Sequence, residues 1–162
     1  METNIINLSS LDGTNGFRMD GAASYDLSGS SVSSAGDING DGYADVIVSA
    51  YFADPNGNYS GSNYVVFGKR SGFGGTIDLS NLDGSNGFRL DGEAAYDNSG
   101  RSVSGAGDVN GDGFDDLLIG AVLASPNGAF AAGSSYLVFG KASGFDTTVD
   151  LSSLDGSNGF EM

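Results

Sequence analysis

A nine-residue stretch with oxygen-bearing side chains at alternating positions occurs twice in the sequence. Its copies span residues 37–45 and 108–116 and read DINGDGYAD and DVNGDGFDD. Asp or Asn stands at positions 1, 3, 5 and 9, and glycine stands at positions 4 and 6. A hard cation such as Ca²⁺ takes six to eight oxygen ligands, which a tight loop of this composition supplies. Glycine at position 6 permits the sharp turn, because it adopts positive φ without a steric cost.

The two stretches are therefore predicted to be calcium loops. The expected ligands are the side chains at positions 1, 3, 5 and 9 and the backbone carbonyl of position 7. They are Asp37, Asn39, Asp41, Tyr43 and Asp45 in the first loop, and Asp108, Asn110, Asp112, Phe114 and Asp116 in the second. The alternative is a pair of acidic turns, because Asp, Asn and Gly dominate turns of every kind. Two copies in the same register, each followed by an apolar run, favour metal sites.

The residues after each loop disfavour an EF-hand. An EF-hand loop carries a bidentate Glu at position 12 and lies between two helices. Here position 12 is Val48 or Ile119, and the stretches after both loops are apolar and rich in β-branched residues. These stretches are typical of strands, and a dockerin-type loop is disfavoured for the same reason.

The two loops belong to a longer internal repeat. Asp37 and Asp108 are 71 positions apart, and so are Leu11 and Leu82, which begin matching LDG(T/S)NGFR segments. A third copy of that segment begins at Leu154 and matches as far as Phe160, after which Glu161 replaces the Arg. One extra residue lies near positions 128–134, since later counterparts are 72 apart. A repeat of this kind has to be recognised before a fold is assigned.

Each repeat is predicted to contain four short strands separated by Gly-, Asn- and Ser-rich turns. The second strand is apolar on successive residues, which indicates burial on both faces. No segment shows a useful length of helical periodicity, so the chain is predicted to be all-β. The expected strands are residues 30–35, 45–50, 63–67 and 16–20 of the first repeat and 101–106, 116–121, 135–139 and 87–91 of the second.

Such a four-stranded antiparallel unit fits a blade of a β-propeller. The first strand of a blade lines the crowded axis, which suits its small side chains, and neighbouring blades cover the middle strands. A parallel β-solenoid with calcium-binding repeats is the competing architecture. Its repeats are short, whereas this unit is about 71 residues long, so the propeller is favoured.

Composition and charge exclude several classes of function. The 162 residues include 21 acidic and six basic side chains, for a formal net charge of −15. Nucleic-acid binding requires a basic surface, so neither nucleic acid nor an anionic membrane is an expected partner. There is no Cys and no His, which removes thiol chemistry and the commonest general base. The first residues do not resemble a secretory signal peptide, and no apolar run reaches the ~20 residues of a membrane helix.

These features resemble the FG-GAP repeat of the integrin α-subunit β-propeller, and a bacterial-type relative in particular. The resemblance is carried by residues 28–32, 36–42 and 45–50 of the first repeat and by 107–113 and 116–121 of the second. In that family the acidic loop joins the first two strands of a blade and carries Ca²⁺. The resemblance therefore implies a calcium-binding propeller with the ten ligands already named.

The chain divides into two expected blades with surplus strands at both ends. Residues 1–21 are expected to supply an outer strand to a neighbouring blade. Residues 22–92 form blade 1, and residues 93–162 form blade 2 and end in a truncated third repeat. Propellers close with about four to eight blades. Closure therefore requires either missing blades or self-association, in which three or four copies form a ring.

The expected function is that of an extracellular or cell-surface module for adhesion or for binding a protein ligand, with calcium in a structural role. A glycan-binding propeller is the alternative, with Tyr25, Tyr51, Tyr59 and Tyr96 as stacking platforms; packing at strand edges is the simpler interpretation of these side chains. An enzyme is not expected. A carboxylate pair of glycosidase type is conceivable, but the Asp clusters are better used by calcium.

Overall fold

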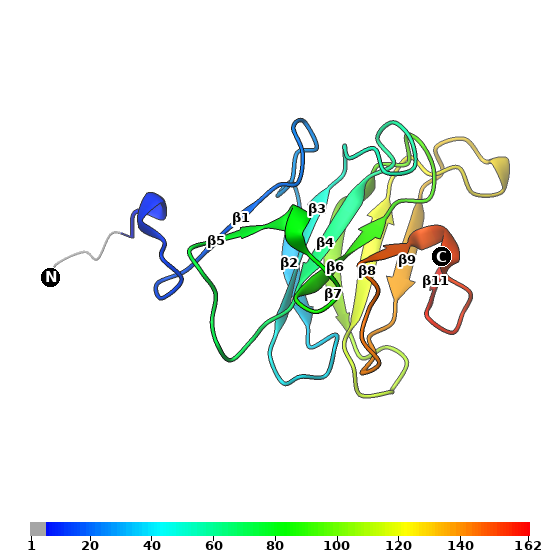
Figure 1. Ribbon diagram of the computed structural model, residues 1–162. Helices are drawn as coiled ribbons and strands as arrows, with labels where there is room; N and C mark the ends of the chain where they lie inside the picture. Colours follow the sequence, from blue (N-terminus) through cyan, green and yellow to red (C-terminus); the bar gives the residue numbers. More distant parts are fainter. Residues whose placement is uncertain (1–5) are drawn as a thin grey trace, which may run out of the picture.

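The computed structural model describes residues 6–162, so the expected segment 1–21 lies partly outside the described residues. Within the described range the chain forms short strands and single-turn 3₁₀ helices, with no α-helix. Figure 1 shows two sheets side by side, with a separate pair of strands at one end. The all-β prediction is confirmed, and the two large sheets are consistent with propeller blades. No helix among residues 6–162 is long and apolar enough to cross a membrane.

The first sheet contains the loop-flanking strands of the first repeat. Its strand order is β10-β6-β4-β3-β2, and all neighbours are antiparallel except β10 and β6. The strands are β2 (Val32–Gly36), β3 (Asp45–Ala50), β4 (Ser62–Val66), β6 (Gly87–Asp91) and β10 (Thr148–Asp150).

The second sheet has the same arrangement one repeat later. Its order is β11-β9-β8-β7, and every neighbouring pair is antiparallel. The strands are β7 (Ser99–Gly107), β8 (Asp116–Ala121), β9 (Ser134–Val138) and β11 (Gly159–Glu161). The strands β3, β6 and β8 have the predicted boundaries, whereas the other predicted strands differ from the prediction by one or more residues at an end.

Two strands were absent from the sequence prediction. β5 (Thr76–Asp78) pairs in parallel with β1 (Arg18–Asp20), and β10 pairs in parallel with β6. The prediction of a purely antiparallel four-stranded unit is therefore wrong for the first sheet, which has a fifth, parallel edge strand. Three-residue strands carry too short an alternation for the sequence to reveal them.

The described chain contains four short 3₁₀ turns. They are η1 (Leu8–Ser10), η2 (Leu79–Asn81), η3 (Pro126–Gly128) and η4 (Leu151–Ser153). Two of them, η2 and η4, directly follow the parallel strands β5 and β10. Asp78 and Asp150 cap η2 and η4, because each side chain accepts the backbone N–H two residues later. Leu79 and Leu151 are buried beneath these turns, which fixes the segments against the sheets.

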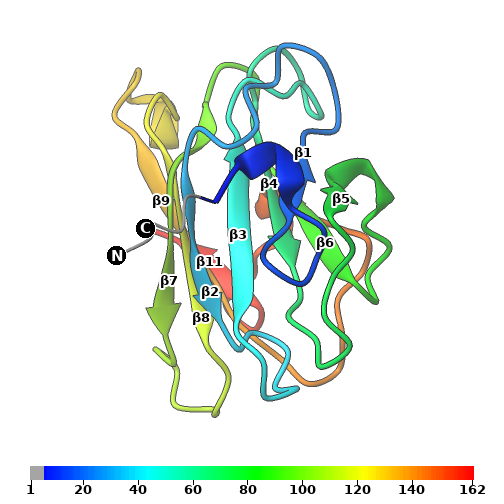
Figure 2. The same ribbon diagram turned by 90° about the vertical axis from the view of Figure 1, so that its left-hand side faces the viewer.

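The main core lies between the two sheets. Ile47, Val65 and Phe88 of the first sheet pack with Leu117 and Ile119 of the second, and all five are fully buried. The inner strands β2 and β7 run next to each other, as Figure 2 shows. A second apolar cluster lies on the outer face of the first sheet, under η2 and β1. The packing of one repeat on the next therefore supplies the larger core.

Candidate functional site

The two predicted loops connect equivalent strands. The first joins β2 to β3 and the second joins β7 to β8, and both lie at the lower end of the view in Figure 1. The glycines at positions 4 and 6 all have positive φ, between 72° and 94°. Such backbone angles are nearly free for glycine and strained for other residues. The sequence argument for a tight turn is confirmed at position 6 and extends to position 4.

The side chains at positions 1, 3 and 5 turn into their own loop. In the first loop, Asp37 accepts the N–H of Asp41 at 3.0 Å and that of Gly42 at 2.9 Å. Asn39 Oδ1 accepts the same Asp41 N–H at 3.0 Å, and Asp41 accepts the N–H of Tyr43 at 2.9 Å. These bonds hold the oxygen-bearing side chains around one small turn.

The second loop repeats this hydrogen-bond pattern. Asp108 accepts the N–H groups of Asp112 and Gly113 at 3.1 and 2.9 Å. Asn110 accepts the Asp112 N–H at 2.9 Å, and Asp112 accepts the Phe114 N–H at 3.0 Å. The two loops therefore share a conformation as well as a sequence.

The carboxylate at position 9 is buried and joins the loop to the sheet. Asp45 accepts the N–H of Ile38 at 3.0 Å and that of Gly68 at 2.8 Å. Asp116 accepts the equivalent N–H groups of its repeat, from Val109 and Gly140, at 2.8 and 3.0 Å. Asp45 is 1% exposed and Asp116 is 0% exposed. Each carboxylate therefore closes its loop and also ties in the segment after β4 or β9.

The negative charges of the first loop destabilise the folded state when no positive charge lies near them. Burial raises the pKa of Asp45 to about 6, the N–H groups of Gly68 and Ile38 oppose the rise, and the charges of Asp41 and Asp37 add to it. Ion pairs within residues 6–162 are confined to Arg18–Asp20 and Arg89–Asp91. None of the loop carboxylates is therefore neutralised by a basic side chain in the described part of the chain.

The donor set fits Ca²⁺, although the described residues do not bring a cluster together. Each loop offers three carboxylates, one amide oxygen and one carbonyl, all of them the hard oxygen donors that Ca²⁺ prefers. Within residues 6–162, however, no three acidic side chains are grouped closely enough to hold a metal. Oxygens at positions 1, 3 and 5 instead accept N–H groups of the loop. The ten-residue ligand set remains a prediction.

A contact that the sequence did not reveal joins the two loops. The N–H of Asp37 donates to Asp115 Oδ2 at 2.8 Å, and the N–H of Asp115 donates to the Asp37 carbonyl at 3.2 Å. Asp115 stands at loop position 8, where the first repeat has Ala44. That difference between repeats is the one signal in the sequence. The first loop is therefore hydrogen-bonded to the second across the interface between the sheets.

The same interface makes the two position-4 glycines unequal. A Cβ on Gly40 would collide with the ring of Phe114, whereas a Cβ on Gly111 would meet nothing within 4 Å. Both have positive φ, so each alanine carries about 1–2 kcal/mol of backbone strain. We expect Gly40→Ala to lower the free energy of unfolding by about 1 kcal/mol more than Gly111→Ala, because only the former also displaces a ring. Urea unfolding of both variants measures the difference, and equal losses would contradict the loop–loop contact.

The tyrosines of the alternative site lie among the loops that connect the other ends of the strands. Tyr51, Phe52, Tyr59 and Tyr96 form a continuous row, with successive ring centroids 4.4, 4.7 and 6.1 Å apart. Tyr25 is outside this row and is largely exposed. The row thus contains three of the four tyrosines named from sequence and adds Phe52. Edge packing explains much of the row, and its exposed rings form an aromatic surface.

Comparison with known proteins identifies a repeat family that matches both acidic loops. The FG-GAP repeat family matches the chain twice, over residues 28–66 and 99–138, and each match contains one acidic loop. Integrin alpha pat-2 of Caenorhabditis elegans is 37% identical over 93 residues, which cover 57% of this chain and 7% of that protein. FG-GAP repeats often bind calcium, and modules of this integrin-like kind are typically non-catalytic and usually extracellular. The chain carries two FG-GAP repeats and is distantly similar to an integrin alpha subunit.

Proposed function

We propose that this chain is a calcium-stabilised FG-GAP module for adhesion or for binding a protein ligand. The observation that carries the proposal is the repeated loop. Two loops of matching sequence adopt the same hydrogen-bonded turn at the same end of equivalent strands. A loop whose sequence supplies three carboxylates without basic partners is suited to a divalent cation. The proposed role is binding and not catalysis.

Calcium would have a structural role in each loop. The residues that would hold it are the ten predicted from sequence, with position 7 contributing its backbone carbonyl. The cation would supply positive charge to carboxylates that otherwise repel one another. The protein's own part is to turn the backbone at its glycines and to anchor position 9 in the sheet, so that the loop is shaped before the cation arrives.

We place the module outside the cell or on its surface. Extracellular calcium modules often bind at ~10⁻⁴–10⁻³ M, so such sites fill outside a cell and stay largely empty in the cytosol. The acidic composition, with 21 acidic against six basic residues, argues against nucleic acid and anionic membranes as partners.

The two sheets would act as blades 1 and 2 of a closed propeller, over residues 22–92 and 93–162, with residues 1–21 serving a neighbouring blade. Propellers need about four to eight blades. We propose that three or four copies supply them by self-association, with further blades of a longer polypeptide as the alternative. Closure would bury the apolar residues that face outward from the two sheets, and monomers rarely leave large apolar surfaces exposed.

Glycan binding is the second candidate function, and the row formed by Tyr51, Phe52, Tyr59 and Tyr96 favours it. Aromatic rings have a large apolar face, and tyrosine adds a hydroxyl for hydrogen bonding. The backbone φ of Tyr59 is 55° and that of Tyr96 is 72°. Backbone angles of this kind in residues other than glycine often mark ligand-contacting segments.

The experiment that tests the calcium proposal is thermal unfolding of the wild type and of Asp41→Ala and Asp112→Ala, in millimolar calcium and in excess chelator. Both substitutions remove an exposed carboxylate. Each is expected to lower the melting temperature by about 3–8 °C in calcium, corresponding to about 1–2 kcal/mol, and to change it little in chelator. Calorimetric titration should give two calcium ions per wild-type chain and one per variant. Equal losses in both conditions would contradict the metal assignment.

A further inference from the structure

The β1 strand has one unpaired edge. It pairs in parallel with β5 alone, and no other strand of the described chain lies against its second edge. Its counterpart one repeat later, β6, pairs in parallel with β10 on one edge and antiparallel with β4 on the other. β1 therefore has half of the pairing that its repeat calls for, and an unpaired edge is a template for another strand.

The local structure around β1 already matches that around β6. Phe17 lies against Phe73 with ring centroids 4.4 Å apart, and their counterparts Phe88 and Phe145 are 4.1 Å apart. Arg18 forms an ion pair with Asp20 at 2.6 Å, as Arg89 does with Asp91 at 2.7 Å. β1 and β5 thus reproduce the outer edge of a sheet that lacks its inner strands.

The missing partner of β1 is a strand equivalent to β4, and the chain contains one more such strand, β9. The outer edge of β9 pairs with the three-residue β11. We infer that β1 of a second copy of this chain pairs antiparallel with β9 in place of β11, so that copies join head to tail by strand exchange. This inference rests on the proposed self-association and specifies the strand that makes the junction.

The register follows from the pairing of β4 with β6. Carried to β9, that register sets Arg18 opposite Tyr136 and Asp20 opposite Ser134. β11 uses the same register but sets Glu161 opposite Tyr136. The exchange therefore replaces an acidic residue with a basic one at a single position of the edge.

Charge favours that replacement. Tyr136 Oη donates to Glu93 Oε2 at 3.0 Å, and Asp97 and Glu161 line the same hollow. Burial raises the pKa of Asp97, the Ala94 N–H lowers it, and the charges of Glu93 and Glu161 raise it further. Three acidic groups thus meet where the first sheet has Arg89. In the exchange Arg18 of a neighbouring copy would take the place of Glu161 and bring a cation to Glu93 and Asp97.

The faces that would meet carry apolar residues that the single chain leaves exposed. Val32 on the first sheet is 60% exposed, whereas its repeat counterpart Val103 is 6% exposed between the sheets. Val109 beside the second sheet is 55% exposed, whereas its counterpart Ile38 is fully buried. A second copy placed head to tail would bury both by repeating the contact that already joins the two sheets.

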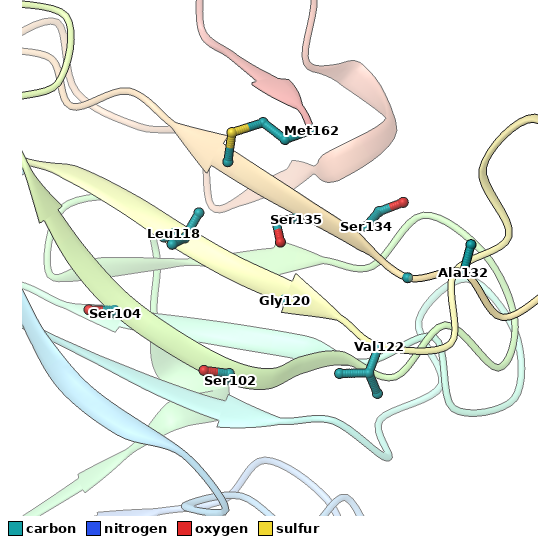
Figure 3. Close-up of a pocket in the computed structure, with 10 residues that line it drawn as sticks. Ser102, Ser104, Leu118, Gly120, Val122, Ala132, Ser134, Ser135 and Met162 are labelled. Carbon is teal, nitrogen blue, oxygen red and sulfur yellow. The ribbon is translucent and has the colours of Figure 1, made fainter.

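A hollow on the free face of the second sheet marks the same surface. It has a volume of about 490 Å³, and Figure 3 shows Ser102, Leu118 and Met162 around it. The counterparts of Leu118 and Met162 in the first sheet are Ile47 and Leu90, both fully buried in the core between the sheets. The hollow is therefore the place that the next first sheet would fill.

The two ends of this junction lie on opposite sides of the molecule, with β1 on the left of Figure 1 and β9 on the right. The contact is thus heterologous, and it generates a ring if the rotation closes and a filament if it does not. β1 cannot reach β9 of its own chain across the intervening sheets, so the exchange requires a second copy.

Engineered disulfides test the exchange, because the chain has no cysteine of its own. Purified Asp20→Cys and Ser134→Cys chains are mixed and oxidised, and the disulfide-linked dimer is followed on a non-reducing gel. The matched control mixes Asp20→Cys with Ser135→Cys, whose side chain points to the opposite face of β9. We expect the first mixture to form the mixed dimer at least tenfold faster than the control.

The possible outcomes distinguish the strand exchange from the self-association on which it rests. Equal rates for the two mixtures, or slow cross-linking of chains that analytical ultracentrifugation shows to be oligomeric, would overturn the strand exchange and leave self-association standing. A wild-type chain that stays monomeric at every concentration would overturn both, while calcium titration would still test the loops. As a second readout, Arg18→Glu should weaken association at least tenfold, and adding Glu93→Arg should restore it. An Arg18→Glu chain that associates like the wild type would also overturn the exchange.

Discussion

Replacing Phe88 with alanine is expected to lower the free energy of unfolding by about 3–5 kcal/mol, the usual cost of emptying a large aromatic site in a core. Phe88 is fully buried between the sheets and stacks on Phe145 with parallel rings 4.1 Å apart. Phe67 completes the aromatic group at 5.8 Å. The substitution removes contacts from both sheets at once, because Phe88 belongs to β6 and lies in the core that joins them. Chemical unfolding monitored by circular dichroism measures the loss.

The repeat supplies a matched control at Phe160. This residue is the counterpart of Phe88 on β11, where it is 38% exposed and meets Phe139 edge-on at 5.9 Å. Phe160→Ala is expected to cost about 1–2 kcal/mol, because the side chain buries less apolar area. Similar losses for the two variants would show that the core between the sheets does not dominate stability.

Replacing Asp45 with alanine is expected to destabilise the protein by about 2–4 kcal/mol, whether or not calcium is present. The substitution leaves two buried N–H groups, of Ile38 and Gly68, without an acceptor. An unsatisfied buried polar group costs about 1–3 kcal/mol, which the removal of a buried charge offsets in part. Asp116→Ala should behave alike, because it frees the equivalent pair of N–H groups.

The comparison with Asp41→Ala separates the anchoring role of Asp45 from the metal-binding role proposed for both residues. Asp41 is exposed and bonds only within its loop, so its removal should matter in calcium and little in chelator. Asp45→Ala should keep most of its effect in chelator. If its loss instead disappeared in chelator, the buried carboxylate would act through the cation alone, and the anchoring role would be wrong. Denaturant unfolding in both buffers gives the four values required.

Much of the architecture could be read from local patterns. The strands after the loops, β3 and β8, were predicted with their observed ends. An unbroken apolar run that directly follows a turn marks both ends of a buried strand. The positive φ of Gly42 and Gly113 was likewise predictable from their place in the loop. By contrast, β5 and β10 escaped prediction, since three residues pairing in parallel with a distant strand leave no periodic signal.

The candidate-site residues that the sequence did not reveal depend on contacts with other segments of the chain. Asp115 gives no sign in its own loop that it binds the backbone of the other loop, at Asp37. Phe52 became part of the aromatic row only because Tyr59 and Tyr96 come from other segments and pack beside it. Sequence patterns reveal contacts between residues that are close along the chain. The partners of Asp115 and Phe52 lie in other segments, so no local pattern reveals them.

The sequence by itself determined the repeat, the composition of the two loops and the all-β class, because spacing and residue type are local properties of the chain. Only the tertiary structure decided which copy of each repeated residue is buried. Phe88 and Phe160 have the same place in the repeat, yet one lies between two sheets and the other at an outer edge. Burial depends on what packs against a residue, and identical repeats have different neighbours wherever the stack of sheets ends.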